Sequence, residues 1–260
     1  MSWAAIMAAA EPCEGGYRAA IPETWLQGRT AYGGLSSALV LDAAIRAGGA
    51  ELPPLRSAQI AMIAPVFGEV TVTAHEVRRG KNVTWMAAEL STEKGTAITA
   101  SFAFQRQQDS AMDHTGYPVP EGLIPVGEAK VFENPRGPVF LREQMEVRFA
   151  LPRAEEKRAE LCWWVRLKER AGLDAMTELM LIADTLPPGV MPLIDLRAPA
   201  STMHWHCNLL DPAPATEDGW WLLRSASDYA RAGFSSEPLM TWNAAGNPMM
   251  ASMQSVAIFG

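Results

Sequence analysis

The same order of elements, one apolar helix followed by a series of strand-like runs, occurs twice along this chain. In the first half, residues 32–49 form the first predicted helix, because pairs of glycines stand at both ends and Ala and Leu fill the interior. In the second half, residues 173–184 form another predicted helix, which Pro187, Pro188 and Gly189 terminate. The first helix is apolar almost all round, which indicates burial against a sheet.

Four strand-like runs follow each predicted helix. Turn residues separate the runs, and alternation is clear in the segment where Ile98, Ala100, Phe102 and Phe104 share one face. No helical segment lies between the four runs that follow a helix, so antiparallel pairing is expected rather than parallel crossover connections. The strands expected after the helices are 55–64, 69–78, 83–90 and 97–105 in the first half and 201–210, 220–227, 233–241 and 249–259 in the second half. A ninth expected strand, 158–168, precedes the second helix.

A segment rich in proline and glycine separates the two halves. We predict an N-terminal unit over residues 1–106, an extended connector over 107–145 and a C-terminal unit over 146–260. Two local matches support an internal repeat, since Pro65 aligns with Pro212 and Ala103 aligns with Gln254. The predicted fold class is therefore α+β, with two similar units that each wrap an antiparallel sheet around one long helix. Two fused units can cover the sheet face and edges that one unit leaves open.

Composition excludes several classes of protein. The 260 residues are 48% apolar, which suffices for one or two buried cores. A net charge of −7 argues against a nucleic-acid binder, which needs a clustered basic face. No apolar stretch approaches the ~20 residues of a membrane span, and the N-terminus lacks the basic region of a signal peptide. The three cysteines form no CxxC pair, so we expect a reducing, cytoplasmic setting without a disulfide framework.

Three polar residues of the second half stand where the local pattern favours something apolar or neutral. Asp184 ends the helix 173–184, where the helix dipole disfavours a carboxylate by ~0.3–1 kcal/mol; a solvated helix end is the alternative. Gln254 shares a strand face with mostly apolar residues, and its amide must find partners, in the backbone or elsewhere, or cost ~1–3 kcal/mol. Thr202 begins the run 201–210, although threonine is favoured in strands in general.

Other groupings have a more ordinary interpretation. His204 and His206 share one strand face, but without a third ligand nearby we expect packed, hydrogen-bonded histidines near the three polar residues rather than a metal site. Cys207 is expected to act as a small buried apolar residue rather than a nucleophile. The adjacent tryptophans at 163–164 and 220–221 point to opposite sheet faces, so one set should pack in the core and the other between units or chains.

The polar residues and their spacing resemble the acyl-CoA thioesterase II family of double-hotdog hydrolases. Asp184 follows an alanine at the end of the second helix, Thr202 precedes Pro212 by ten residues, and Gln254 lies in an Ala-Ser-Met-Gln sequence. One departure is that Gln254 follows Ser252 by two residues, one fewer than the family spacing. The resemblance covers most of the chain outside the connector, with weak identity but the same order of elements.

The resemblance implies an enzyme that hydrolyses an acyl-CoA thioester to a free acid and CoA. Asp184, Thr202 and Gln254 would be the catalytic residues that hold and activate a water molecule, which suits thioester hydrolysis because it needs a base and a positioned nucleophile. Gly33 and Gly34 would approach the substrate at the helix N-terminus, and Tyr32 stands where the family often has histidine. The resemblance further implies an acyl-CoA partner, a homodimer or higher oligomer, and no metal or other cofactor.

Two other functions fit the same predicted fold, because fold does not determine function. One is a non-catalytic acyl-CoA binding or scaffold protein, which would bind acyl-CoA without releasing a thiol. The other is a hotdog dehydratase, which usually depends on a catalytic histidine with an acidic partner. Neither His75 nor His114 lies on a predicted helix, which disfavours the dehydratase.

Overall fold

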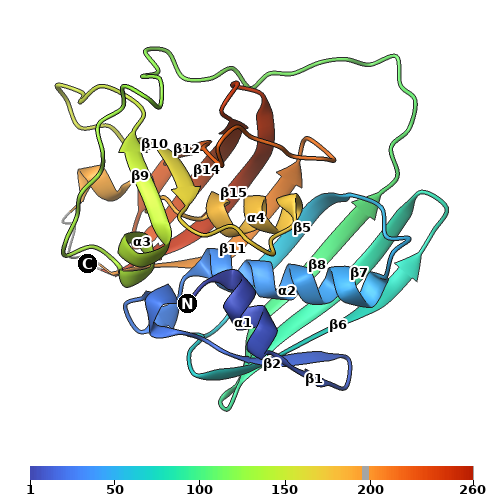
Figure 1. Ribbon diagram of the computed structural model, residues 1–260. Helices are drawn as coiled ribbons and strands as arrows, with labels where there is room; N and C mark the ends of the chain where they lie inside the picture. Colours follow the sequence, from blue (N-terminus) through green and yellow to red (C-terminus); the bar gives the residue numbers. More distant parts are fainter. Residues whose placement is uncertain (195–198, 260) are drawn as a thin grey trace.

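The computed structural model describes residues 1–194 and 199–259 and shows an α+β protein built on one large antiparallel sheet (Figure 1). The helices are α1 (Trp3–Ala9), α2 (Gly33–Gly48), α3 (Val139–Gln144) and α4 (Ala175–Ala183), with short 3-10 turns η1 (Glu23–Trp25) and η2 (Met191–Leu193). The strands of the first half are β1 (Glu11–Cys13), β2 (Gly16–Ala20), β3 (Leu26–Gln27), β4 (Thr30–Ala31), β5 (Leu55–Met62), β6 (Glu69–Arg79), β7 (Val83–Thr92) and β8 (Gly95–Gln105). The strands of the second half are β9 (Met145–Phe149), β10 (Glu160–Leu167), β11 (Ala200–Leu209), β12 (Trp221–Ala226), β13 (Tyr229–Arg231), β14 (Phe234–Asn243) and β15 (Pro248–Ile258).

The two halves contribute to a single continuous sheet. Its strand order is β1-β2-β6-β7-β8-β5-β11-β15-β14-β12-β10-β9, and β3 and β4 form a separate ribbon. Strands β5 and β11 join the halves as antiparallel neighbours, with Ala58 opposite Cys207 and Ile60 opposite Trp205. The two halves are therefore linked by main-chain hydrogen bonds between β5 and β11.

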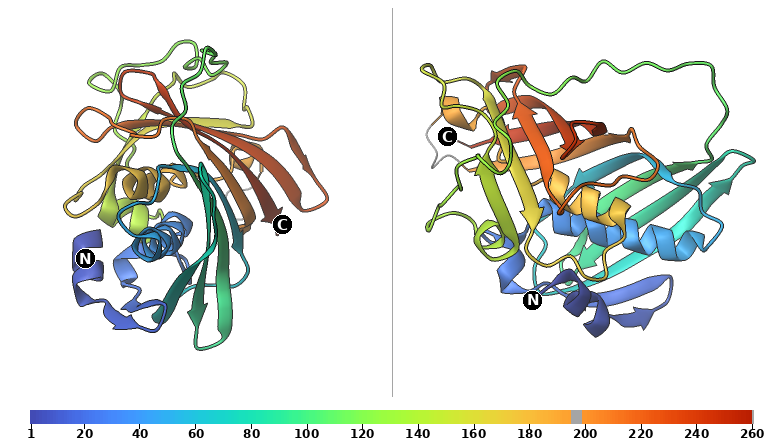
Figure 2. Two further views of the ribbon diagram at one scale, coloured as in Figure 1. Left: turned by 90° about the vertical axis from the view of Figure 1, so that its right-hand side faces the viewer. Right: turned by 45° about the horizontal axis from the view of Figure 1, so that its top comes forward.

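Helices α2 and α4 lie side by side on the same face of the sheet, which we call the inner face (Figure 2). The sixteen residues of α2 bury Leu35, Leu39 and Leu41 completely, as its apolar outline predicts. Gly49 ends α2 with φ near +73°, a left-handed conformation that favours glycine. The side chain of Asp174 caps α4 by accepting two backbone N–H bonds. Among the described residues, no helix is both long enough and apolar enough to cross a membrane.

Each strand predicted from alternation coincides with an observed strand to within a few residues, as do both predicted helices. The structure adds α1, β1 and β2 before the first helix, which the sequence patterns did not indicate. The predicted connector, residues 107–145, contains no helix or strand over 107–138, but the expectation of an extended chain is wrong at its end, where α3 forms. Pro138 directly precedes α3. The many prolines and glycines before it indicate loop structure, so a helix of only six residues was not predicted from the sequence.

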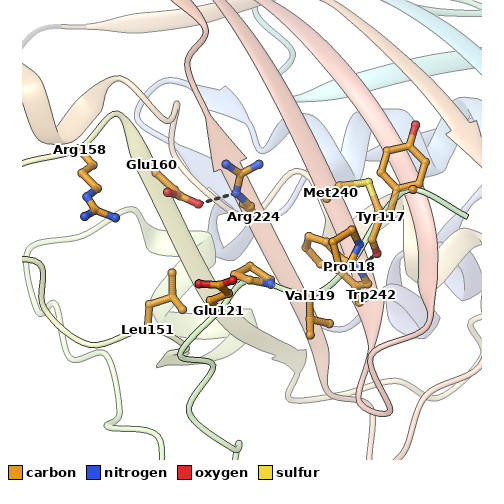
Figure 3. A pocket seen from close by; sticks show the side chains of 12 residues that line it. Tyr117, Pro118, Val119, Glu121, Leu151, Arg158, Glu160, Arg224, Met240 and Trp242 are labelled. Atoms are coloured by element: carbon orange, nitrogen blue, oxygen red, sulfur yellow. Dashed lines mark hydrogen bonds and ion pairs between the residues drawn. The ribbon is translucent and has the colours of Figure 1, made fainter.

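The connector covers the opposite, outer face of the sheet in the second half. Trp163 and Trp221 pack in the inner core, whereas Trp164 and Trp220 belong to a second cluster on the outer face, as the adjacent pairs predicted. Side chains of the connector, including Val119, pack on this outer cluster. The prediction that these tryptophans pack between units or between chains is therefore wrong. A pocket of about 470 Å³ lies between connector and sheet and is lined by Tyr117, Arg224, Met240 and Trp242, among others (Figure 3).

The two halves share an irregularity that reveals how they correspond. In the pairing of β5 with β8, the register shifts between Leu55 and Ser57; in the pairing of β11 with β15, it shifts between Thr202 and His204. Both shifts bypass a single residue, as a β-bulge does.

When the strand pairs are aligned at their bulges, Leu55 corresponds to Thr202 and Phe102 corresponds to Gln254. The predicted alignment of Ala103 with Gln254 is therefore wrong by one residue. Phe102 is fully buried, whereas Ala103 is half-buried on the outer face. A one-residue slip in a strand exchanges the two faces, which is why a match of sequence letters placed the wrong side chain opposite Gln254.

Candidate active site

Asp184 lies directly after the last residue of α4 and meets groups from both halves of the chain. Its Oδ1 atom accepts a hydrogen bond of 2.6 Å from Nε2 of Gln254 on β15. The backbone N–H of Gly34, in the first turn of α2, also hydrogen-bonds to this carboxylate. The dipole of α4 disfavours a carboxylate at this end of the helix. Hydrogen-bond donors from β15 and from the N-terminus of α2 compensate for this.

Thr202 extends this chain of hydrogen bonds. Its Oγ1 atom donates to Oε1 of Gln254 at 3.2 Å, so the Gln254 amide accepts from Thr202 at one end and donates to Asp184 at the other. The two contacts together determine which way the amide is oriented. The structure therefore brings the three predicted catalytic residues into one line, with Gln254 only 5% exposed.

The bulge at Met203 is what allows Thr202 to join the site. In a regular strand, Thr202 would share a face with His204 and point away from Trp205. The register shift between Thr202 and His204 breaks this alternation, so that Thr202 reaches Gln254, which lies directly opposite Trp205.

Burial changes the acidity of Asp184. It raises the pKa of the Asp184 carboxyl from 3.8 to about 7, although the hydrogen bonds from Gln254 and Gly34 act to lower it. A carboxyl group with this pKa is present in both protonation states near neutral pH. That is the range in which a general base accepts a proton and returns it most effectively.

Gly33 and Gly34 are required by the close packing of α2 against Asp184 and α4. A Cβ atom on Gly33 would lie 2.5 Å from Oδ2 of Asp184, and one on Gly34 would lie 2.2 Å from the carbonyl oxygen of Leu181. The Gly34 N–H is directed at the Asp184 carboxylate. The structure thus assigns the glycines a role in helix contact, and their predicted approach to substrate stays a prediction.

Tyr32 joins the two helices from a fully buried position. Its hydroxyl donates to the carbonyl oxygen of Leu181 at 2.7 Å and lies 3.1 Å from Oγ1 of Thr185. Its ring stacks on Phe140 of α3 with 4.0 Å between ring centroids. Burial, and secondarily the charge of Asp184, raise the pKa of Tyr32 well above its usual value. In the structure, the Tyr32 hydroxyl bonds to Leu181 and Thr185. The predicted contact between Tyr32 and the substrate stays a prediction.

The histidines do not lie where they were expected. His204 and His206 are exposed on the outer face, so the prediction of packed histidines near the polar residues is wrong. The bulge explains this, because it places Thr202 and the histidines on opposite faces. Across residues 1–194 and 199–259, no three or more His, Cys, Asp or Glu are grouped to hold a metal ion.

Cys207 is fully buried, and burial together with the charge of Asp184 raises the pKa of its thiol well above the usual value. A cysteine nucleophile needs the opposite, a thiol whose pKa is lowered. Cys207 therefore behaves as the small buried residue that was predicted.

Sequence reasoning missed Glu237, a carboxylate with no exposed surface on β14. It accepts hydrogen bonds from the Ser235 hydroxyl and from the backbone N–H of Gly189, and it lies directly opposite Gln254 in the strand register. Glu237 thus anchors the loop that follows Asp184 to the strand beside Gln254. Strand alternation could have predicted the burial of Glu237, because it occupies the same strand face as the buried residues Ser235 and Leu239.

Two models of protein-family domains match this chain. Residues 21–105 match the model of the acyl-CoA thioesterase N-terminal domain, and residues 120–258 match that of the acyl-CoA thioesterase C-terminal domain. A search of curated proteins finds no significant match.

Several solved structures are similar over their whole length. A protein of unknown function with a hot dog fold from Alicyclobacillus acidocaldarius is 18% identical, with 100% of this chain and 99% of that chain covered and a TM-score of 0.88. A tesB protein from Mycobacterium avium subspecies paratuberculosis is 13% identical over 100% of both chains, with a TM-score of 0.78. The acyl-CoA thioesterase II TesB2 from Mycobacterium marinum is 14% identical over 96% of both chains, with a TM-score of 0.71.

At these identities the structural likeness shows the hotdog fold alone. The two family models, one in each half and the second spanning more than half of the chain, show more than the fold. The chain belongs to the acyl-CoA thioesterase family.

Proposed function

We propose that this protein is an acyl-CoA thioesterase that hydrolyses an acyl-CoA to a free acid and CoA. The observation that carries the proposal is the hydrogen-bonded chain from Thr202 through Gln254 to Asp184, which ends on a half-buried carboxylate with a raised pKa. The proposed architecture is a tandem double hotdog with one active site per chain. Its polar residues come from the unit over 146–260, and α2 of the unit over 1–106 closes the site.

The reaction needs a water molecule that attacks the thioester carbonyl carbon. In the proposed mechanism, the Asp184 carboxylate accepts a proton from this water as the oxygen–carbon bond forms. The tetrahedral intermediate then collapses, the carbon–sulfur bond breaks, and Asp184 returns the proton to the departing CoA thiolate. The products are the acid and the CoA thiol, and no covalent intermediate on the protein is required.

Gln254 and Thr202 support this step by orientation. Gln254 holds one carboxylate oxygen of Asp184, and Thr202 holds the amide of Gln254, so neither side chain has to reorganise during the reaction. Groups fixed before the reaction lower its barrier because their ordering is completed in the folded state. The high pKa of the Cys207 thiol also favours water over cysteine as the nucleophile.

The test is thiol release from a panel of acyl-CoAs that differ in chain length and aromaticity, measured with a thiol reagent. We expect release by the wild type and a loss of ~10²–10⁴-fold in kcat for Asp184→Asn, the range that a general base supplies. Asp42→Asn, at a half-buried position of α2 where Asp42 pairs with the exposed Arg46, serves as the matched control. Equal turnover by wild type and Asp184→Asn would refute the mechanism.

The pH profile provides a second test of the same base. Because the ionised form of Asp184 accepts the proton, kcat/KM of the wild type should rise with pH and level off above about 7. A profile that is flat between pH 5 and 8 would contradict the assignment.

The same assay separates hydrolysis from a non-catalytic acyl-CoA binding role. Binding of acyl-CoA without thiol release, across the whole panel, would support the scaffold alternative. A cytoplasmic location and assembly into a homodimer or larger oligomer complete the proposal, and light scattering of the purified protein measures the assembly.

A further inference from the structure

Two buried polar atoms beside the proposed site have no hydrogen-bond partner among the described residues. They are the indole nitrogen Nε1 of Trp205 and the hydroxyl oxygen Oγ of Ser252. Buried polar groups in folded proteins are nearly always paired, so each exception calls for an explanation. Four other buried tryptophans follow the rule, since the indoles of Trp25, Trp164, Trp221 and Trp242 donate to Met1, Ile124, Glu178 and Tyr117.

The strand register places both atoms next to Gln254. Trp205 lies directly opposite Gln254, and Ser252 lies directly opposite Cys207 in the same pairing of β11 with β15. Residues two apart on a strand share a face, so these four side chains form one block on the inner face. Diagonal neighbours in such a block lie within reach of a large aromatic side chain.

The block is close to the reacting groups. Gln254 donates to Asp184, and the charge of Asp184 contributes to the raised pKa of the Cys207 thiol. The third buried atom without a partner, Oγ1 of Thr177, lies seven residues before Asp184 in chain order, about 10 Å away along α4 at a rise of ~1.5 Å per residue. Trp205 and Ser252 are therefore the unpaired groups that adjoin the site.

Thioester hydrolysis creates a negative charge on the carbonyl oxygen, and this charge needs hydrogen-bond donors. The Gly34 N–H, a natural candidate at a helix N-terminus, is already directed at Asp184. An indole N–H is a donor only, and a serine hydroxyl donates readily. A carbonyl oxygen has two lone pairs and accepts both.

We propose that the indole N–H of Trp205 and the hydroxyl of Ser252 form the oxyanion hole of this enzyme. They donate to the thioester carbonyl oxygen as water attacks the adjacent carbon, and they release it when the carbon–sulfur bond breaks. The inference rests on the proposed thioesterase function. It assigns a substrate-contacting role to two residues outside the chain of Asp184, Gln254 and Thr202.

The first half of the molecule supports this assignment by contrast. The shared bulge makes Ala58 equivalent to Trp205 and Ala100 equivalent to Ser252. Neither alanine has a polar side-chain atom, and both are buried. Within the described part of the chain, the unpaired donors thus occur only in the half of the sheet that carries Gln254. In the first half, alanines occupy the equivalent positions of the same backbone arrangement.

The test compares Trp205→Phe and Ser252→Ala, each of which removes one donor while retaining most of the side-chain shape. We expect each to lower kcat by ~10²–10³-fold with little change in KM, as loss of one oxyanion donor does. Trp242→Phe is the matched control, because it removes an indole that donates to Tyr117 on the outer face (Figure 3). Its kcat should equal that of the wild type.

A pair of CoA thioethers tests the contact without turnover. A 2-oxoalkyl-CoA keeps a carbonyl near the position of the thioester carbonyl, whereas an alkyl-CoA has none. The wild type should bind the 2-oxoalkyl-CoA more tightly, and both variants should lose this preference while their affinity for the alkyl-CoA is unchanged. A change in packing alone would weaken both ligands alike and would overturn the proposal.

The outcomes distinguish this inference from the proposed function. If the wild type hydrolyses acyl-CoA and Asp184→Asn does not, but Trp205→Phe and Ser252→Ala retain full kcat, the oxyanion hole is refuted and the thioesterase remains. If the wild type hydrolyses nothing, the proposed function fails, and the thioether pair still reports whether the two donors bind a carbonyl. Should Trp205→Phe not fold, Ser252→Ala decides the question by the same measurements.

Discussion

The two halves of the central sheet have the same backbone plan but opposite chemistry at equivalent positions. Around its bulge, the first half carries the buried apolar residues Leu55, Ala58, Ala100 and Phe102. The second half carries Thr202, Trp205, Ser252 and Gln254 at the equivalent places. The comparison teaches that the bulge and the strand pairing do not depend on polar side chains. The polar set occurs in only one of the two copies of this framework.

The carboxylate that Gln254 contacts in the second half has an electrostatic cost. Burial raises the pKa of Asp184 to about 7, which means that the folded protein disfavours the ionised carboxylate. Residues that destabilise the fold in this way are typical of active sites, where function requires them. Four predictions, ordered from the largest expected effect to the smallest, test whether the difference between the halves is functional.

Replacing the amide of Gln254 by an apolar side chain, as in the first half, should have the largest effect on activity. Gln254→Leu removes both the donor to Asp184 and the acceptor for Thr202, and we expect kcat to fall by ~10²-fold or more because the carboxylate loses its orientation. Phe102→Leu, at the equivalent position of the first half, is the control and should leave kcat unchanged. A similar loss of kcat in both variants, measured by thiol release, would contradict a catalytic role for Gln254.

A side chain on Gly33 should disturb the carboxylate from the opposite side. The added Cβ of Gly33→Ala would lie 2.5 Å from Oδ2 of Asp184, so the carboxylate or α2 must move. We expect kcat to fall by roughly 10-fold or more, within the ~10²-fold range of a 1 Å misplacement. Gly127→Ala, where an added Cβ meets no atom within 4 Å, should have no effect. Full activity of Gly33→Ala would argue against a fixed Asp184.

Loss of the outermost hydrogen bond should have a moderate effect. Thr202→Val keeps the shape of the side chain but removes the hydroxyl that donates to Gln254 at 3.2 Å. A hydrogen bond of this kind contributes about 1 kcal/mol, which corresponds to roughly a fivefold loss in kcat/KM. Thr202→Ser retains the hydroxyl and should recover most of the activity. Equal kinetics of the Val and Ser variants would remove Thr202 from the mechanism.

The electrostatic cost should appear in the pH dependence of stability. The folded pKa of Asp184, about 7, lies above the usual value of 3.8, so the stability from the protonated group is present at low pH and is lost as pH rises through about 7. Asp184→Asn cannot ionise. The free energy of unfolding of the variant, relative to the wild type, should therefore increase between pH 4 and 7 and then level off. Urea unfolding at pH 5 and pH 8 measures this, and a constant difference would contradict the raised pKa.

Local patterns predicted the long elements well and the short ones poorly. Glycines bracket α2, and the alternation of Phe102 and Phe104 with smaller residues marks β8, so these elements could be placed within a few residues. The three residues of β1 are too few to show a periodicity, and α3 is only six residues long after a proline-rich segment. The boundaries proposed for the two units and the connector stay predictions.

The sequence by itself determined the order of the elements and pointed to Asp184, Thr202 and Gln254 as polar residues in unfavourable positions. Only the tertiary structure decided that these three meet, that His204 and His206 face away, and that Phe102 rather than Ala103 is the counterpart of Gln254. The physical reason is that strand alternation is a local property with a period of two, whereas a bulge arises where two distant strands pair. The pKa of Asp184 likewise depends on burial between helices from both halves, which no local pattern contains.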